Sequence, residues 1–295
     1  MNLDYLKEYE PLYIIGHKNP DTDTIISSKI LSDIFNYYGI KSEYAILEDN
    51  YELDDYNKLM INDCLTYKPT IITKDKLKLN NYFLVDHNDP IQSVGDNVNI
   101  IGGIDHHTDT KKINNLLLTD YCCTALYIYS LFKDKYEFSN IQKHQIYMAF
   151  LNDSKFTKSS RYKKKDEELV KTLGLNSDYS SLFKQYFIPT DLSLGVKEVF
   201  KNGYKRHNLS GVEFESSYIE SFNNNYLEEY ITLIKNYPHN FLGIWINYET
   251  DNTYAYFKYN DTIKQFDYDF IASRATTITN DVLNYLNKKE FIKTK

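Results

Sequence analysis

The first 180 residues alternate between short apolar runs and amphipathic segments, and this alternation restricts the fold more than any other feature of the chain. Apolar runs typical of buried strands occur at residues 12–15, 42–47, 82–85 and 98–104. Apolar residues at helical spacing occur at residues 25–35, 55–64, 122–132, 140–151 and 166–173. Alternating strands and helices predict an α/β fold with a mostly parallel sheet and helices on both of its faces.

The periodicity is interrupted near residues 186–196 by proline, glycine and short polar residues. We therefore expect a first domain over residues 1–186, a linker over residues 187–196 and a second domain over residues 197–295. A length of 295 residues is typical of two domains.

In the second part of the chain the expected strands are 212–220, 241–249 and 253–259, and the expected helix between them is 227–235. A final helix is expected after Thr279, whose hydroxyl can cap it. This order of elements predicts a smaller C-terminal α/β domain with a mixed sheet.

Three of the expected strands are followed by clusters of aspartate and histidine. The first is followed by GHKNPDTD, the third by DH and the fourth by DHH. Because functional sites in open parallel sheets form at the carboxyl ends of the strands, we expect these clusters to converge. The side chains concerned are His17, Asp21, Asp23, Asp86 and His106.

Several carboxylates in one place repel one another unless cations neutralise them, so the clusters predict a metal site. Asp21 and Asp23 lie two positions apart, so in an extended loop both project to the same side, and each can hold one of two ions with Asp86 between them. Mixed nitrogen and oxygen ligands favour Mn²⁺ or Co²⁺, and the absence of thiolates from the clusters argues against structural zinc. Such an ion pair activates water for displacement at phosphorus, so the residues indicate hydrolysis of a phosphate ester or anhydride.

The first cluster taken alone has a simpler interpretation, a proline-containing turn whose Asp and Thr side chains cap a helix. The coincidence of three such clusters favours the metal site.

These motifs resemble those of the DHH phosphoesterases, and within them the family II, manganese-dependent inorganic pyrophosphatases. The resemblance covers the expected N-terminal domain nearly end to end. It rests on GHKNPDTDTI (16–25), VDHNDPIQS (85–93), IDHHTD (104–109), CTA (123–125), FLNDSKFTKS (150–159) with Asp166, and TDLS (190–193) at the position of that family's linker.

The resemblance implies a site for two Mn²⁺ or Co²⁺ ions per subunit. Its metal ligands would be His17, Asp21, Asp86 and Asp153 for one ion, and Asp23, Asp86 and His106 for the other. It also implies that His107 contacts the substrate and donates a proton, and that Lys205 of the second domain binds phosphate. A further Mg²⁺ would arrive with the substrate.

The implied reaction is hydrolysis of inorganic pyrophosphate to two phosphates by a hydroxide that bridges the two metals. Lys205, Arg274 and His107 would stabilise the departing phosphate.

The chain departs from that family in its second half, where the family's Ser-Arg-Lys-Lys-Gln is replaced by Ser273-Arg274-Ala275-Thr276-Thr277. Arg274 keeps a guanidinium that can bind phosphate in two places. Loss of the adjacent lysine is expected to lower turnover about 10- to 100-fold if nothing compensates. The altered segment leaves open a DHH-type phosphoesterase acting on short polyphosphate, a nucleotide or a phosphodiester, and also a module that binds phosphate without turnover.

Charge and cysteine content limit the partners. With 34 basic and 41 acidic residues the formal charge is −7, which argues against nucleic acid as a stable partner and still allows a small anionic phosphate substrate.

Three cysteines, two of them adjacent, suit a reduced compartment. With no secretory pattern at the N-terminus and no apolar run of about 18 residues, we expect a cytoplasmic protein without membrane contact. The resemblance also allows a homodimer.

A run of basic residues follows Asp153, from Lys155 and Lys158 to Arg161 and residues 163–165. Such a run is usually a solvated face. The alternative is that Lys158 or a neighbour attracts the anionic substrate.

Overall fold

The computed structural model describes residues 3–48, 67–107, 109–110, 112–155, 157–159, 161–175, 190 and 192–293. These residues divide into two compact units. One unit takes in the described residues of Met1–Thr157 and Arg161–Phe187, and the other those of Lys158–Ser160 and Ile188–Lys295.

The first unit is built on a parallel six-stranded sheet in the order β3-β2-β1-β4-β5-β6. Its strands are β1 (Leu12–Ile15), β2 (Ser42–Leu47), β3 (Thr70–Ile72), β4 (Asn81–Val85), β5 (Asn99–Asp105) and β6 (Leu116–Leu118). The expected parallel α/β fold is therefore confirmed, and the four strands expected from the sequence are β1, β2, β4 and β5.

The α-helices described in this unit are α1 (Thr22–Tyr37), α3 (Thr124–Phe132), α4 (Asn140–Asp153) and α5 (Lys164–Lys171). They agree with four expected helices to within a few residues at each end. The fifth expected helix, at residues 55–64, lies outside the described residues. Short 3₁₀ helices are η1 (Asp4–Tyr9), η3 (Lys74–Leu79) and η4 (Pro90–Gln92).

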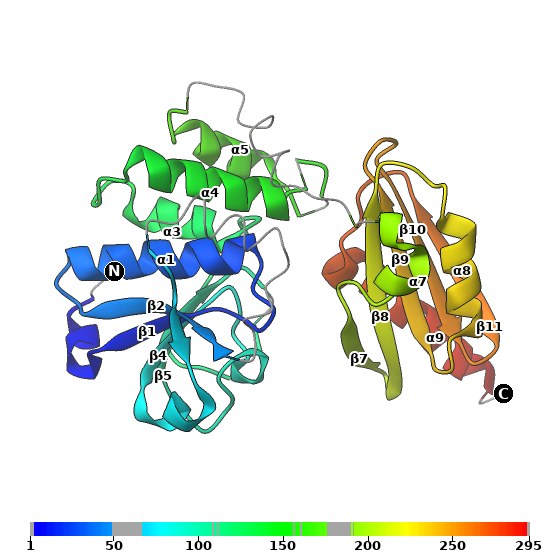
Figure 1. The fold of residues 1–295 in the computed structure, drawn as a ribbon, viewed down its shortest axis with the longest axis horizontal. Helices are drawn as coiled ribbons and strands as arrows, with labels where there is room; N and C mark the ends of the chain where they lie inside the picture. The colour runs from blue at the N-terminus through cyan, green and yellow to red at the C-terminus, as the bar shows by residue number, and fades with distance from the viewer. Residues whose placement is uncertain are drawn as a thin grey trace. The chain divides into compact units, whose positions relative to one another are not determined.

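Successive strand residues point to opposite faces of the sheet, so one strand can contribute to two cores. Ile14 and Phe83 belong to the larger core, together with apolar residues of all four α-helices. Ile15 and Leu84 belong to a second core on the opposite face, where Leu77 of η3 packs. In the described residues the α-helices thus gather on one face of the sheet, as Figure 1 shows, whereas helices were expected on both faces; on the opposite face the 3₁₀ helix η3 packs.

The second unit contains a mixed five-stranded sheet in the order β11-β10-β9-β8-β7. Its strands are β7 (Lys205–Leu209), β8 (Val212–Ser221), β9 (Phe241–Asn247), β10 (Asn252–Tyr259) and β11 (Thr262–Tyr268). Only β8 and β9 pair in parallel, and the other neighbours are antiparallel. This confirms the expected mixed sheet.

The helices of the second unit are η5 (Leu192–Leu194), α7 (Val196–Val199), α8 (Leu227–Asn236) and α9 (Thr279–Lys293). Val196 lies in the core of this unit with Tyr230 of α8 and Trp245 of β9, so the end of the expected linker is structured. Thr279 is the first residue of α9, not its cap, because a π-helical turn (Arg274–Ile278) leads directly into the helix. Among the described residues, no helix is long and apolar enough to span a membrane.

Candidate metal centre

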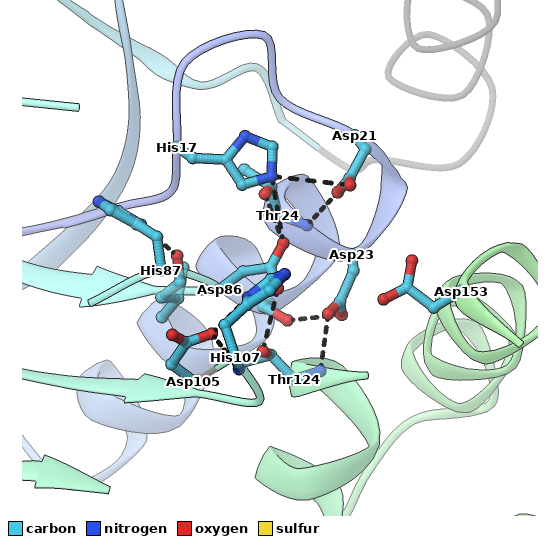
Figure 2. Close-up of polar contacts among 12 residues, drawn as sticks. His17, Asp21, Asp23, Thr24, Asp86, His87, Asp105, His107, Thr124 and Asp153 are labelled. Carbon is cyan, nitrogen blue, oxygen red and sulfur yellow. Dashed lines mark hydrogen bonds and ion pairs between the residues drawn. The ribbon is translucent and has the colours of Figure 1, made fainter. Parts of the chain in front are cut away.

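Asp86 lies at the middle of a cluster of acidic and imidazole groups at the carboxyl ends of β1, β4 and β5 (Figure 2). It follows β4 directly and has a positive φ of 60°, a conformation that is uncommon outside glycine and that concentrates at functional sites. Its side chain is 1% exposed. The buried carboxylate therefore faces groups from several loops at once.

One group of potential ligands contains His17, Asp21 and Asp86. His17 Nε2 lies 3.6 Å from Asp21 Oδ2 and 3.4 Å from Asp86 Oδ2. Asp21 also caps α1, where its Oδ1 accepts a hydrogen bond of 3.0 Å from the backbone N–H of Thr24. This hydrogen bond fixes the end of the loop after β1, and it therefore also fixes the carboxylate of Asp21.

A second group contains Asp23, His106 and Asp153. His106 Nε2 lies 3.1 Å from Asp86 Oδ1, 3.5 Å from Asp153 Oδ2 and 4.0 Å from Asp23 Oδ2. All six predicted metal ligands thus come together, with Asp86 in contact with both histidines.

The grouping differs from the expected one at a single residue. The resemblance puts Asp153 with His17 and Asp21, whereas in the structure it lies with Asp23 and His106. The reason is its position at the last residue of α4, on the Asp23 side of the cluster in Figure 2.

Asp23 is held by the start of α3. The backbone N–H groups of Thr124 and Ala125 donate to its two carboxylate oxygens at 2.6 and 2.8 Å, and Ser27 Oγ donates at 3.0 Å. The partial positive charge of a helix N-terminus favours a carboxylate at this place. Asp86 is oriented similarly by the hydroxyls of Thr24, at 2.7 Å, and Thr124, at 3.2 Å.

Asp105 is a site residue that the sequence analysis did not single out, although it is the first residue of the DHH motif. It ends β5, and its Oδ1 accepts from the backbone N–H groups of His106 and His107 and lies 2.8 Å from His107 Nδ1. Asn88 Nδ2 donates to its other oxygen. Asp105 therefore fixes both histidines, and a buried acid directly before them was the available signal.

His87 follows Asp86 but turns away from the cluster. Its Nδ1 contacts Val85 O at 2.8 Å and its Nε2 contacts Ser93 Oγ at 2.6 Å. Burial lowers the pKa of His87 to about 4. Its ring stands edge-on to that of His17 at 6.4 Å, so it supports a ligand side chain.

The acidic groups of the cluster lie close together, and burial and mutual repulsion shift their pKa values. Burial, together with the neighbouring carboxylates, raises the pKa of Asp23 and of Asp153 well above the ordinary value. Burial opposes ionisation of Asp86 too, but hydrogen bonds from His106 and His17 outweigh it and hold its pKa well below the ordinary value. For His17, burial is outweighed by Asp21 and Asp86, which raise its pKa. The donor set thus fits divalent cations of mixed nitrogen and oxygen preference.

Lys205 and Arg274, the other predicted site residues, lie in the second unit. Lys205 is exposed and begins β7, where it pairs with Ser216. Arg274 Nη1 donates to Gly203 O and lies 3.4 Å from Ser216 Oγ, and its guanidinium lies over the Tyr218 ring. Arg274 thus contacts Ser216, and Lys205 stands opposite Ser216 in the β7–β8 pair.

The same edge of the second unit holds a histidine that the sequence analysis did not select. His207 Nε2 lies 2.7 Å from Ser216 Oγ. Burial, with the positive charges of Arg274 and Lys205, lowers its pKa to about 4. Beyond Arg274, Ala275 and Thr276 are exposed and bring no charge.

Comparison with known proteins agrees with this geometry. Residues 11–152 match the model of the DHH family, N-terminal domain. The manganese-dependent inorganic pyrophosphatase of Bacillus subtilis is 27% identical over 189 residues, which cover 57% of this chain and 57% of that protein. A Lactiplantibacillus plantarum protein named probable manganese-dependent inorganic pyrophosphatase is 29% identical over 177 residues, 56% of this chain and 55% of that protein. The chain therefore spans little more than half the length of these curated relatives.

Two solved structures share the fold. A Methanococcus jannaschii protein assigned to the family II inorganic pyrophosphatases superposes with a TM-score of 0.66 at 20% identity, over 84% of this chain and 87% of that one. An exopolyphosphatase-related protein of Bacteroides fragilis superposes with a TM-score of 0.52 at 12% identity, over 87% and 82%. The strand-end motifs and these matches lead to one conclusion: residues 11–152 of this chain resemble the DHH family, N-terminal domain, and the chain resembles the family II inorganic pyrophosphatases.

Proposed function

We propose that this chain is a metal-dependent hydrolase that splits inorganic pyrophosphate into two phosphates. The observation that carries the proposal is the pair of ligand groups that meet at Asp86, one around His17 and one around His106. Relatives named as manganese-dependent pyrophosphatases support it. Residues 1–186 would form the catalytic domain and residues 197–295 the substrate-binding domain.

Two Mn²⁺ or Co²⁺ ions would be held by this cluster. His17, Asp21 and Asp86 would hold one, and Asp86, Asp23, His106 and Asp153 the other. Bound ions supply Lewis acidity to water and to phosphate oxygens, and a Mg²⁺ ion would accompany the substrate. The raised pKa values of Asp23 and Asp153 support this assignment, because they express the repulsion that a cation would relieve.

His107 would donate a proton to the departing phosphate. Its Nδ1 contacts Asp105 Oδ1 at 2.8 Å, and its side chain is 38% exposed. The contact through Nδ1 would orient the ring and leave Nε2 for the substrate. Lys205 and Arg274 would bind phosphate oxygens, since Arg274 contacts Ser216 and Lys205 stands opposite that residue on the neighbouring strand.

A second candidate keeps the metal site and changes the substrate to short polyphosphate, a nucleotide or a phosphodiester. The observation that favours it is the sequence after Arg274, where Ala275, Thr276 and Thr277 provide no cation. A cytoplasmic location and a homodimer remain predictions from the sequence and the resemblance.

The test is a substrate panel on protein reconstituted with Mn²⁺. Phosphate release from pyrophosphate, tripolyphosphate and a dinucleotide is measured for the native chain, Asp86→Asn and Asp89→Asn. Asp89 is a matched control, because it is a nearby carboxylate that pairs with Lys112 and does not belong to the ligand groups.

We expect pyrophosphate to be the best substrate and Asp86→Asn to lower its turnover by about 100-fold or more, while Asp89→Asn keeps the native rate. Equal rates for the native chain and Asp86→Asn, or no release from any substrate, would contradict the mechanism. Faster turnover of tripolyphosphate or the dinucleotide would favour the second candidate.

A further inference from the structure

Arg161 places a positive charge against the metal centre. Its Nη2 lies 3.3 Å from both ring nitrogens of His106, and the two residues belong to the same unit. The side chain is half-buried and lies eight positions beyond Asp153. The guanidinium therefore contacts the imidazole that is proposed to bind metal.

The imidazole that Arg161 contacts also lies close to two of the proposed carboxylate ligands. His106 Nε2 is 3.1 Å from Asp86 Oδ1 and 3.5 Å from Asp153 Oδ2. The arginine thus places its positive charge beside these carboxylates.

Charge balance indicates what this arginine does once metal is bound. The aspartates of the two proposed ligand sets are Asp21, Asp23, Asp86 and Asp153, whose four negative charges two divalent ions would neutralise completely. A phosphate anion that enters such a centre meets Lewis acidity but no net positive charge from the ligand set. A guanidinium beside His106 would supply that charge, with forked N–H donors that match phosphate oxygens.

We propose that Arg161 exchanges partners when the metals bind, leaving the His106 nitrogen and binding a phosphate oxygen of the substrate or product. The inference rests on the proposed function, because the anion is the phosphate group of that reaction. It assigns a substrate-binding role to one residue of the basic run and leaves the others as a solvated face.

The Arg161 guanidinium and a Mn²⁺ ion would both lie beside His106 and repel each other. Removing the arginine should therefore strengthen Mn²⁺ binding and weaken phosphate binding. Arg161→Gln should bind Mn²⁺ more tightly, by about threefold to tenfold, since a competing positive charge is gone. The loaded variant should bind inorganic phosphate about 10- to 100-fold more weakly. Arg161→Lys keeps the charge without the planar fork and should restore phosphate binding in part.

Isothermal titration of Mn²⁺, and then of inorganic phosphate into the Mn²⁺-loaded full chain, measures both effects. Lys164→Gln is the matched control, because it removes an exposed charge from the same basic run and should change neither affinity. Circular dichroism of each variant confirms that it is folded.

Unchanged phosphate affinity in Arg161→Gln, no phosphate binding by the loaded native chain, or a parallel loss of both affinities overturns the inference. The last result would indicate a structural role. If phosphate binding depends on Arg161 but pyrophosphate is not hydrolysed, the inference stands and the proposed function fails. If pyrophosphate is hydrolysed and phosphate affinity is independent of Arg161, the proposed function stands alone.

Discussion

Gly16 shows how a single backbone position serves the metal centre. A Cβ atom at this residue would lie 2.1 Å from Thr24 Cγ2. Thr24 is buried, and its hydroxyl donates to Asp86 Oδ2 at 2.7 Å. The glycine therefore leaves the space in which a threonine can orient the central carboxylate.

The variant Gly16→Ala should displace Thr24 and weaken its hydrogen bond to Asp86. We expect a loss of about 1–3 kcal/mol in the free energy of unfolding and about tenfold weaker Mn²⁺ binding. Chemical denaturation and calorimetric titration measure the two effects.

The double variant Gly16→Ala/Thr24→Ser provides the control, because serine keeps the hydroxyl and removes the clashing methyl group. It should recover most of the Mn²⁺ affinity. A double variant as impaired as Gly16→Ala would show that the glycine serves some other purpose.

The convergence of the proposed ligands that follow strands was predictable from the sequence. His17, Asp86 and His106 follow three strands of one parallel sheet, so topology alone brings them to one edge. The position of Asp153 was not predictable from local sequence, because this residue ends α4. Which ligand group it joins depends on how α4 packs against the rest of the unit.

Two helices of the first unit meet the cluster with opposite ends, α3 with its N-terminus and α4 with its C-terminus. α3 offers its N-terminal N–H groups to Asp23, whereas α4 carries Asp153 at its C-terminal end. The opposite end of α4 has a capping box, in which Ser139 Oγ accepts from Gln142 N at 3.2 Å and Gln142 Oε1 accepts from Ser139 N at 3.0 Å. The cap lies about 20 Å along the helix from Asp153.

Ser139→Ala should therefore lower the stability of the protein without changing how the site binds metal. We expect the free energy of unfolding to fall by about 1 kcal/mol, because the cap loses its acceptor. Mn²⁺ affinity of the folded protein should stay within about twofold of the native value, as measured by titration. Ser139→Thr, which keeps a hydroxyl, should restore the stability, and a large drop in Mn²⁺ affinity in Ser139→Ala would disprove this separation.

The strands that the sequence analysis missed share one property. β3 and β6 are the edges of the first sheet, and β7 and β11 are the edges of the second, whereas every strand that was predicted is interior. An interior strand is flanked on both sides and is covered by core, so its sequence carries a clear apolar pattern. An edge strand such as β7, with the sequence KRHNL, is specified by backbone pairing with its neighbour.

The stability of the whole molecule depends on pH through groups of the metal centre that hold protons when no metal is bound. His17, Asp23 and Asp153 all have raised pKa values, so these groups hold protons in the folded protein at pH values where they would lose them when unfolded. Stability contributed by such protonation is present at low pH and is lost as the pH rises through the raised pKa values. Asp21 and Asp86 have lowered pKa values and are already ionised in this range.

Metal binding should therefore release protons, because Mn²⁺ requires ionised carboxylates and neutral imidazole. We expect the Mn²⁺ affinity to rise with pH while His17, Asp23 and Asp153 still hold protons, and to level off above their pKa values. The increase in melting temperature on Mn²⁺ addition should accordingly be larger at about pH 8 than at about pH 6, since fewer protons then compete with Mn²⁺ for these groups. Calorimetric titration in two buffers of different ionisation enthalpy counts the released protons directly.

The variant Asp153→Asn removes one of these groups, so it should release fewer protons and flatten the dependence of Mn²⁺ affinity on pH. The surface variant Asp89→Asn should leave both unchanged, because its carboxylate pairs with Lys112 outside the ligand groups. A Mn²⁺ affinity that does not change with pH, and binding without proton release, would mean that the cluster is already ionised before metal arrives. The repulsion among its buried carboxylates would then have to be balanced by cations of the chain itself, of which Arg161 is the one seen in contact with His106 among the described residues.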